Sequence, residues 1–115
     1  MPSQVVNARI RGFICLNAHP GGCAANVRGQ VDAVGRVLAQ AGGAHARIGD
    51  ALVIGSSTGY GLASLITTVF GYGARAVGVC LERAPQGDKT ASAGWYNLAA
   101  VHRLARAAEI GRAHV

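Results

Sequence analysis

With 115 residues, of which 50% are hydrophobic and 14% charged, the chain has the composition of one compact domain and not of a disordered segment. Its formal charge of +6 comes almost wholly from dispersed arginines, with no basic run that could follow a phosphate backbone, so we expect no nucleic-acid partner. The chain shows no signal-peptide pattern, no unbroken apolar segment of membrane-spanning length and no CxxC pair, so we expect a reduced, cytoplasmic protein without a membrane partner.

The N-terminal third predicts a strand, a turn and a helix. Residues 10–15 form a short apolar run with a β-favouring middle, which indicates a strand. The sequence His-Pro-Gly-Gly over residues 19–22 then requires a turn. The helix that follows should end at the two glycines of residues 42–43, and it carries four apolar residues at a 3.6-residue period: Val27, Val31, Val34 and Leu38.

Two apolar strands with a helix between them are predicted next. Residues 50–54 form a continuous apolar run, typical of a parallel strand that is buried on both faces. Residues 76–81 form the second run, after two glycines that should end the helix, Gly71 and Gly73. The helix between the strands has a clear apolar face, made of Leu62, Leu65, Ile66, Val69 and Phe70.

The C-terminal part predicts a polar loop over residues 83–92 and a last helix that begins near Ser92. One side of this helix should carry Trp95, Leu98, Ala99 and His102. Strands and helices therefore alternate along the chain. This order predicts an α/β fold, a partial doubly wound, Rossmann-like parallel sheet with flanking helices.

A glycine-rich turn carries the strongest chemical signal in the sequence. Residues 55–61 read Gly-Ser-Ser-Thr-Gly-Tyr-Gly, directly after a predicted strand and directly before a predicted helix. Gly55 permits the tight turn, and Gly59 lets the backbone come close to a diphosphate. Gly61 lets the helix pack close to the strand. Strand, turn and helix together predict a dinucleotide-binding site, with a glycine-rich turn that binds nothing as the alternative.

Phosphates would be held mainly by the N–H groups at the start of the helix, with the positive end of its dipole. The hydroxyls of Ser56, Ser57 and Thr58 could add further donors. No Gly-Lys-Ser or Gly-Lys-Thr closes the turn, so it is not the P-loop of a nucleoside triphosphatase.

An acidic residue is expected about 20 positions after such a turn, at the end of the next strand. Glu82 occupies that place, where its carboxylate could accept the ribose hydroxyls and repel a 2′-phosphate. This favours NADH over NADPH, although the neighbouring Arg83 weakens the preference because an arginine can pair with a 2′-phosphate. The alternative is that Glu82 is a solvated charge at the end of a strand.

The spacing of the glycines in the turn resembles that of the short-chain dehydrogenase superfamily. The turn and its flanking segments together resemble, more specifically, the N-terminal portion of FabV-type trans-2-enoyl reductases. The likeness runs from about Arg9 to Arg106. The matching segments are residues 11–15, 19–20, 22–23, 25–27, 55–62, 70–71, 78–79, 82 and 93–97. Members of that family are several times longer than this chain.

That resemblance implies a parent enzyme that uses NADH to reduce a trans-2-enoyl thioester of acyl carrier protein (ACP) or coenzyme A (CoA), to the saturated thioester of fatty-acid synthesis, as a monomer. It implies that this chain supplies cofactor binding. Carried over onto this sequence, the cofactor-binding residues are Gly55, Ser56, Ser57, Thr58, Gly59, Tyr60 and Gly61 at the diphosphate, and Leu81 and Glu82 on the adenosine side.

The catalytic residues of that family have no counterpart here. Its proton donor is a tyrosine separated by eight residues from a lysine. None of the tyrosines of this chain, Tyr60, Tyr72 and Tyr96, has a lysine at that distance. We therefore expect no catalytic residue in this chain and no activity from it alone.

We expect residues 1–108 to be the cofactor-binding portion and residues 109–115 to be a non-native tail, because the last residues read like a translated sequencing-adapter oligonucleotide. A doubly wound sheet cut off there would expose an apolar face. The alternatives are a small natural protein with half a fold, part of another short-chain dehydrogenase, and a non-catalytic nucleotide-binding fragment.

Two further groups of residues have a chemical and a structural interpretation. Cys15, His19 and Cys23 have C-x3-H-x3-C spacing, but a fourth ligand is missing, so we expect no metal. Trp95 and Tyr96 are expected in the core, with a role beside the adenine or the substrate as the alternative.

Overall fold

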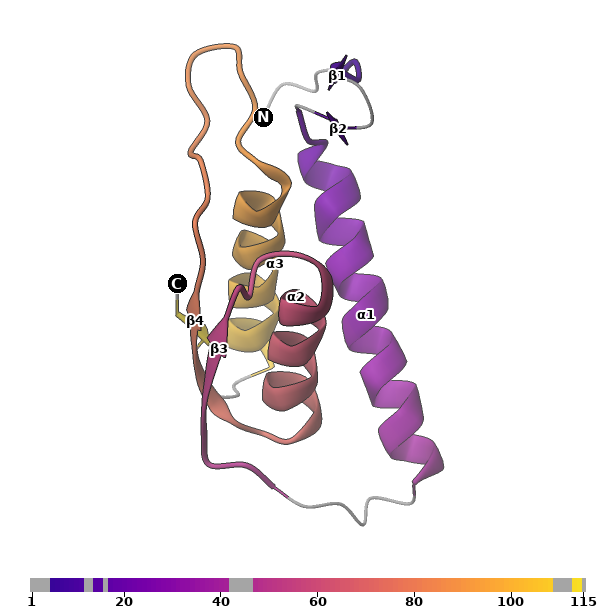
Figure 1. Ribbon diagram of the computed structural model, residues 1–115. Coiled ribbons are helices and arrows are strands. Elements are labelled where there is room, and N and C mark those ends of the chain that lie inside the picture. Colours follow the sequence, from indigo (N-terminus) through magenta and orange to yellow (C-terminus); the bar gives the residue numbers. More distant parts are fainter. Residues whose placement is uncertain (1–4, 12–13, 16, 42–46, 109–112, 115) are drawn as a thin grey trace.

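The main sheet of the protein is parallel and has the strand order β3-β4-β5 (Figure 1). Its strands are β3 (Asp50–Ile54), β4 (Arg75–Val79) and β5 (Ala113–His114). The register of the first two runs from Asp50 opposite Arg75 to Ile54 opposite Val79, so both strands end at the same edge. The computed structural model describes residues 5–11, 14–15, 17–41, 47–108 and 113–114.

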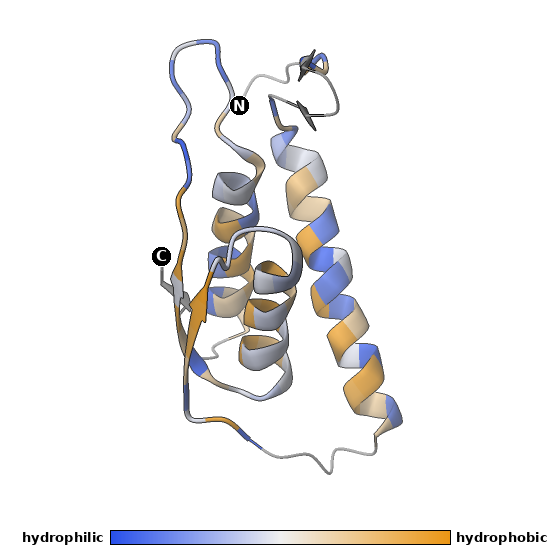
Figure 2. Ribbon diagram, viewed as in Figure 1, coloured by the Kyte–Doolittle hydropathy of each residue, from blue (hydrophilic) through white to orange (hydrophobic). Residues whose placement is uncertain are grey.

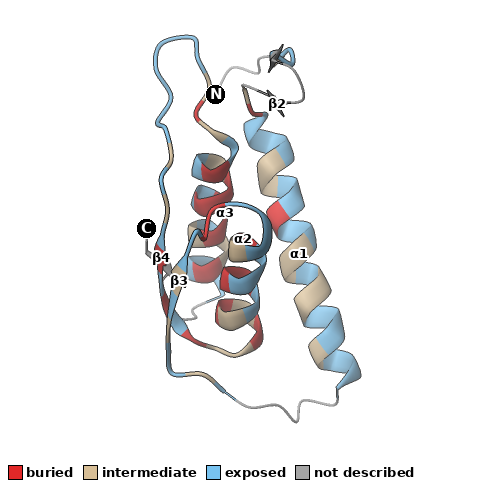
Figure 3. Ribbon diagram, viewed as in Figure 1, coloured by how far each residue is buried: buried red, intermediate tan, exposed pale blue. Residues whose placement is uncertain are grey.

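Two helices, α2 (Gly59–Ile66) and α3 (Ala93–Ala107), lie on one side of this sheet, and α1 (Pro20–Gln40) packs against these helices and not on the strands (Figure 1). The π-helical segment η1 (Thr67–Gly71) continues α2, and the two together make the crossover from β3 to β4. Figure 3 shows buried residues gathered on α2, on α3 and along β4. The core consists of Val27, Leu62, Leu65, Ile66, Val69, Ala76, Leu98, Ala100, Val101 and Ala105.

The opposite face of the sheet is apolar and exposed. Leu52 and Ile54 are 66% and 77% exposed, whereas Ala51 and Val53 pack against the core. Figure 2 shows β3 as one of the most hydrophobic segments. The predicted bounds of this strand are confirmed, and so is the expected exposed face. Its predicted burial on both faces is wrong for the described residues, because the helices cover only one side.

The second strand is shorter than the sequence predicts. The apolar run continues to Leu81, but β4 ends at Val79, since β3 ends opposite it at Ile54 and offers no further partner. At the other end of β4, Arg75 forms the first rung, and its guanidinium lies 2.9 Å from the carboxylate of Asp50.

The predicted strand over residues 10–15 is wrong in form. The structure has β1 (Ile10–Arg11) and β2 (Ile14–Cys15), which pair antiparallel with Ile10 opposite Cys15. The two ends of the run therefore pair with each other. It belongs to a separate two-stranded sheet, not to the parallel one.

The first helix begins at the predicted turn. His19 is its N-cap, and the Nδ1 atom of its ring accepts a hydrogen bond of 2.9 Å from the N–H of Gly22. Pro20 follows, a residue that suits a first helical position because it has no N–H to leave unpaired. Val27 is fully buried and Val31 packs on the core, which confirms the predicted apolar face. The predicted end at residues 42–43 lies outside the described residues.

The helix after the glycine-rich turn has the predicted face, since Leu62, Leu65, Ile66 and Val69 are all buried. It starts earlier than the apolar residues alone suggest, at Gly59, so that the turn itself leads into the first helical residues.

Within the described part of the chain, no helix is both long and apolar enough to cross a bilayer.

The predicted face of the last helix is wrong in part. Its core side is formed by Gly94, Asn97, Leu98, Ala100, Val101 and Ala105. Trp95 is 44% exposed and Ala99 is exposed, because the side that packs inward is rich in small residues that allow close approach. Tyr96 is half-buried, and its hydroxyl accepts a hydrogen bond of 2.9 Å from the N–H of Ala91. The core interpretation of Trp95 is therefore not supported in the described residues.

The cap of α1 can be tested with two substitutions at one position. His19→Ala removes the acceptor for Gly22 and should lower the free energy of unfolding by about 1 kcal/mol. His19→Asn supplies a common N-cap acceptor and should retain most of the stability. Urea denaturation followed by circular dichroism measures both, and an equal loss in the two variants would contradict a capping role.

Candidate functional site

The glycine-rich turn of residues 55–61 connects the end of β3 to the start of α2. Two of its glycines have backbone conformations that other residues rarely adopt, with φ of +77° at Gly55 and +55° at Gly59. Neither has an atom within 4 Å of the place where a Cβ would stand, so open space lies beside both. The geometry matches the sequence interpretation, a tight turn at Gly55 and an approachable backbone at Gly59.

The third glycine of the turn is required by packing. A Cβ at Gly61 would overlap the carbonyl oxygen of Gly55, lie 2.6 Å from the carbonyl carbon of the same residue and lie 3.3 Å from the Cα of Ser56. The first turn of α2 therefore rests directly on the main chain that leaves β3. No side chain fits between them.

The N–H groups of the turn divide into two sets. Those of Gly55 and Ser56 donate to the carbonyl oxygen of Val79, at 2.7 and 3.4 Å, and so tie the turn to the end of β4. Those of residues 57–61 have no acceptor of ordinary hydrogen-bond geometry within the described part of the chain. Thr58, Gly59 and Tyr60 are also exposed. The turn thus presents unpaired donors at the N-terminus of a helix, which suits an anion.

The hydroxyls of the turn differ from the expectation of three free donors. Ser56 is fully buried, and its Oγ has no hydrogen-bond partner among the described residues. The hydroxyl of Ser57 donates to Glu82. Only Thr58 keeps an exposed side chain, and its hydroxyl does not cap α2. The prediction is therefore wrong for the side chains of Ser56 and Ser57, which the packing of the turn directs inward.

Glu82 lies beside the turn because it follows β4, the neighbour of β3. One of its carboxylate oxygens accepts the hydroxyl of Ser57 and the other accepts the hydroxyl of Ser92. Ser92 in turn accepts the N–H of Arg83 at 3.0 Å. Glu82 is half-buried and hydrogen-bonded on both oxygens, so it is not a solvated charge at a strand end.

The first turn of α3 closes this group of residues. A Cβ at Gly94 would overlap the carboxylate of Glu82 and lie 2.6 Å from the Cβ of Ser57. Asn97, which lies three residues further along α3, donates from Nδ2 to the carbonyl oxygen of Ser57 at 3.0 Å. The sequence interpretation used residues 93–97 only as a family likeness. The sequence offered no signal for this contact, because the side of the helix that was predicted to face the core carries Trp95 and Leu98 and not Asn97.

Two exposed apolar side chains flank the same edge. Tyr60 is 95% exposed and Leu81 is 98% exposed. Both belong to the predicted cofactor-binding set, and they stand on the two segments that leave the carboxyl ends of β3 and β4. Such surfaces are available for contact with a bound molecule or with another part of a longer chain.

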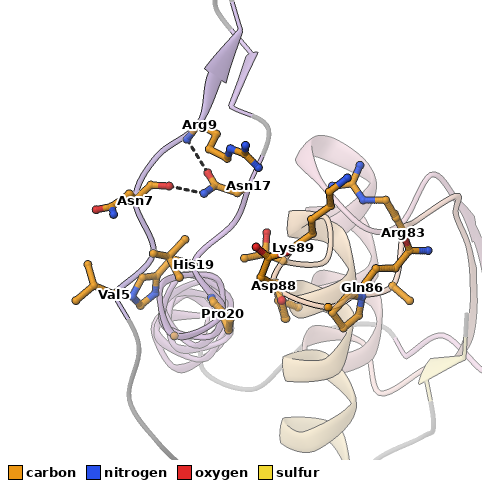
Figure 4. Close-up of a pocket in the computed structure, with 17 residues that line it drawn as sticks. Val5, Asn7, Arg9, Asn17, His19, Pro20, Arg83, Gln86, Asp88 and Lys89 are labelled. Carbon is orange, nitrogen blue, oxygen red and sulfur yellow. Dashed lines mark hydrogen bonds between the residues drawn. The ribbon is translucent and has the colours of Figure 1, made fainter.

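A cavity of about 890 Å³ lies elsewhere, between the N-terminal segment and the loop of residues 83–90 (Figure 4). None of the predicted cofactor-binding residues lines it. Its described lining holds three cations, Arg9, Arg83 and Lys89, and one acid, Asp88, all with exposed side chains. The cavity is thus separate from the glycine-rich turn, and we place no cofactor contact in it.

The cysteine and histidine residues near α1 do not form a described ligand set. The side chain of Cys15 lies outside the described residues, and one ring nitrogen of His19 already accepts the N–H of Gly22. Burial raises the pKa of the Cys23 thiol. Among the described residues, no three His, Cys, Asp or Glu side chains gather closely enough to hold a metal ion.

The sequence is similar to a known protein family and to several named proteins. Residues 5–87 match the family model of the NAD(P)H binding domain of trans-2-enoyl-CoA reductase. A protein of Pseudoalteromonas atlantica named enoyl-acyl-carrier-protein reductase (NADH) is 55% identical over 103 residues, which are 90% of this chain and 25% of that protein. A protein of the same name from Idiomarina loihiensis is 51% identical over 105 residues, 91% of this chain and 26% of that protein.

Solved structures give the same result for the fold. The trans-2-enoyl-CoA reductase of Treponema denticola in complex with NAD matches with a TM-score of 0.88 and 38% identity, over 97% of this chain and 28% of that one. The trans-2-enoyl-CoA reductase of Clostridium acetobutulicum in complex with NADH matches with a TM-score of 0.81 and 28% identity, over 96% and 27%. The predicted Rossmann-like α/β fold is confirmed, and the chain spans about a quarter of the length of these relatives.

The close packing at Gly61 leads to a test of the turn. Gly61→Ala forces the main chain of α2 away from Gly55 and should lower the free energy of unfolding by roughly 1–3 kcal/mol. Gly35→Ala is the matched control, because this glycine lies in α1 with nothing near its Cβ position, and the change should stabilise by about 0.5–1 kcal/mol. Denaturant unfolding measures the free energy of unfolding of both variants. An unchanged value for Gly61→Ala would contradict the close approach of α2 to the main chain of Gly55.

Proposed function

Because the chain belongs to the family described as the NAD(P)H binding domain of trans-2-enoyl-CoA reductase, we propose that it binds NADH through its glycine-rich turn. One observation carries the proposal. The N–H groups of residues 57–61 have no acceptor in the described part of the chain and stand at the N-terminus of α2. Unpaired donors and the positive end of a helix dipole are what a diphosphate requires.

The proposed diphosphate contacts are mostly made by the main chain. Thr58 can add its exposed hydroxyl, and Gly59 leaves open space for the phosphates. Ser56 contributes shape and not a donor, because its N–H is paired and its hydroxyl is buried. The full proposed set is Gly55, Ser56, Ser57, Thr58, Gly59, Tyr60 and Gly61.

The adenosine side of the cofactor is proposed to lie against Leu81 and Glu82. Leu81 offers an exposed apolar surface. Each oxygen of the Glu82 carboxylate already accepts one serine hydroxyl but has a second lone pair, so it can also accept a ribose hydroxyl. Its negative charge would repel a 2′-phosphate, which supports NADH over NADPH.

For the parent enzyme we propose reduction of a trans-2-enoyl thioester, carried on ACP or CoA, to the saturated thioester. Bound NADH would supply the hydride. The proton must come from a residue outside the sequence given, because no tyrosine of this chain has a lysine at the family's spacing. We therefore propose that this chain alone binds cofactor without catalysing the reduction, and that residues 1–108 make up the binding portion.

Cofactor binding can be tested with a pair of glycine substitutions. Gly59 and Gly87 both have positive φ, +55° and +56°, and both have open space at the Cβ position, so an alanine should strain the backbone equally at either site. Fluorescence titration should show saturable NADH binding by the wild-type chain. Gly59→Ala should weaken it about tenfold, because the methyl group occupies space proposed for the phosphates, and Gly87→Ala should leave it unchanged.

Two results would count against this proposal. One is the absence of saturable NADH binding to a chain that circular dichroism shows to be folded. The other is an equal loss of affinity in the two alanine variants, which would indicate that the strain and not the position of Gly59 matters.

The choice between NADH and NADPH can be tested at Glu82. Glu82→Gln removes the charge but keeps hydrogen-bonding groups for Ser57 and Ser92, whose hydroxyls can rotate to donate or accept. We expect the ratio of NADPH to NADH affinity to rise about tenfold, measured by parallel titrations. An unchanged ratio would limit Glu82 to a structural role.

A further inference from the structure

Ser57, the first residue of the set with free N–H groups, is held by two hydrogen bonds, one at its hydroxyl and one at its carbonyl oxygen. The hydroxyl of Ser57 donates to Glu82, which follows β4. Its carbonyl oxygen accepts from the side-chain amide of Asn97, 40 residues away in α3, at 3.0 Å. Asn97 is only 6% exposed, so this hydrogen bond is buried.

The second contact has a consequence for the neighbouring residue. The carbonyl of Ser57 and the N–H of Thr58 belong to one peptide group, which is planar and trans, as are all peptide bonds between the described residues. In such a group the C=O and the N–H point in opposite directions. When Asn97 holds the carbonyl toward α3, the N–H of Thr58 must therefore point away from α3, toward the open side of the turn.

We infer that Asn97 is a positioning residue for the cofactor site: its side-chain amide fixes the Ser57–Thr58 peptide so that the N–H of Thr58 faces the diphosphate. The inference rests on the proposed function of the turn and adds to it a residue outside the turn. Asn97 does not itself reach the cofactor. Its effect passes through the carbonyl of Ser57.

The packing of α3 supports this role. Gly94 lies one helical turn before Asn97, and a Cβ there would overlap the carboxylate of Glu82 and press on Ser57. The absence of a side chain at Gly94 lets the helix approach closely enough for the short Asn97 side chain to reach the turn. Burying a side-chain amide costs free energy unless the amide is hydrogen-bonded. Its contact with a main-chain carbonyl at the phosphate-facing turn accounts for a polar residue on the inward face of α3.

The first test uses the unaltered chain without ligand. In a nuclear magnetic resonance (NMR) experiment, the Nδ2 nitrogen of Asn97 should show a scalar coupling across the hydrogen bond to the carbonyl carbon of Ser57, and the amide of Thr58 should exchange rapidly with solvent. Absence of the coupling, or a strongly protected Thr58 amide, would overturn the inference. This result does not depend on NADH binding, so it separates a failure of the inference from a failure of the proposed function.

The second test changes the donor. Asn97→Asp keeps the size of the side chain but replaces the amide donor with a carboxylate, which repels the Ser57 carbonyl. We expect shifted amide signals at residues 57–61 and NADH affinity, corrected for the folded fraction, about tenfold weaker. Ser64→Ala is the matched control, because it removes another hydrogen bond to a main-chain carbonyl, that of Tyr60, on the exposed side of α2. The control should leave the affinity of the folded chain unchanged.

The outcomes are decisive in either direction. If Asn97→Asp folds and binds NADH as the wild type does, Asn97 is only a structural residue and the inference is wrong. If the variant does not fold, the coupling and exchange measurements on the unaltered chain decide alone. If the wild-type chain shows the coupling but no NADH binding, the geometry of the turn stands and the proposed function fails.

Discussion

The site depends on the last rung of the ladder between two parallel strands. The carbonyl of Val79 accepts the N–H groups of both Gly55 and Ser56, so the chain that leaves β3 is anchored to the end of β4. Parallel strands in this register finish at one edge, and whatever follows each of them must lie side by side. That is why the glycine-rich turn and Glu82, far apart in sequence, come into hydrogen-bonding contact through Ser57.

Two helix N-termini meet at this edge, and they differ in the groups that surround them. The first turn of α3 lies against the carboxylate of Glu82, so a negative charge of the protein itself occupies the positive end of that helix. The start of α2 has no acidic residue in its first turn and keeps unpaired N–H groups. One positive end is satisfied internally and the other remains for a ligand. This contrast favours the turn, and not the first turn of α3, as the place for phosphates.

Periodicity predicted the parts of the structure whose packing is local. The bounds of β3 and the buried face of α2, with Leu65 at its centre, follow directly from the pattern of apolar residues. The likeness to enoyl reductases, predicted from short motifs, is confirmed by the family model over residues 5–87 and by the solved structures. Contacts between distant segments were missed. No pattern in the sequence shows that the Ser57 hydroxyl points inward or that Asn97, and not Trp95, faces the core, because both depend on how α3 docks on the turn.

The chain spans about a quarter of its relatives, yet the residues that shape the turn all lie inside it. Gly61 sets the approach of α2, Ser57 and Glu82 join the ends of the two strands, and Asn97 joins both to α3. The bare face of the sheet, with Leu52 and Ile54 exposed, lies outside these contacts. The geometry of the glycine-rich turn is therefore a local property of residues 55–97. The described segments outside this range make none of the contacts that shape the turn.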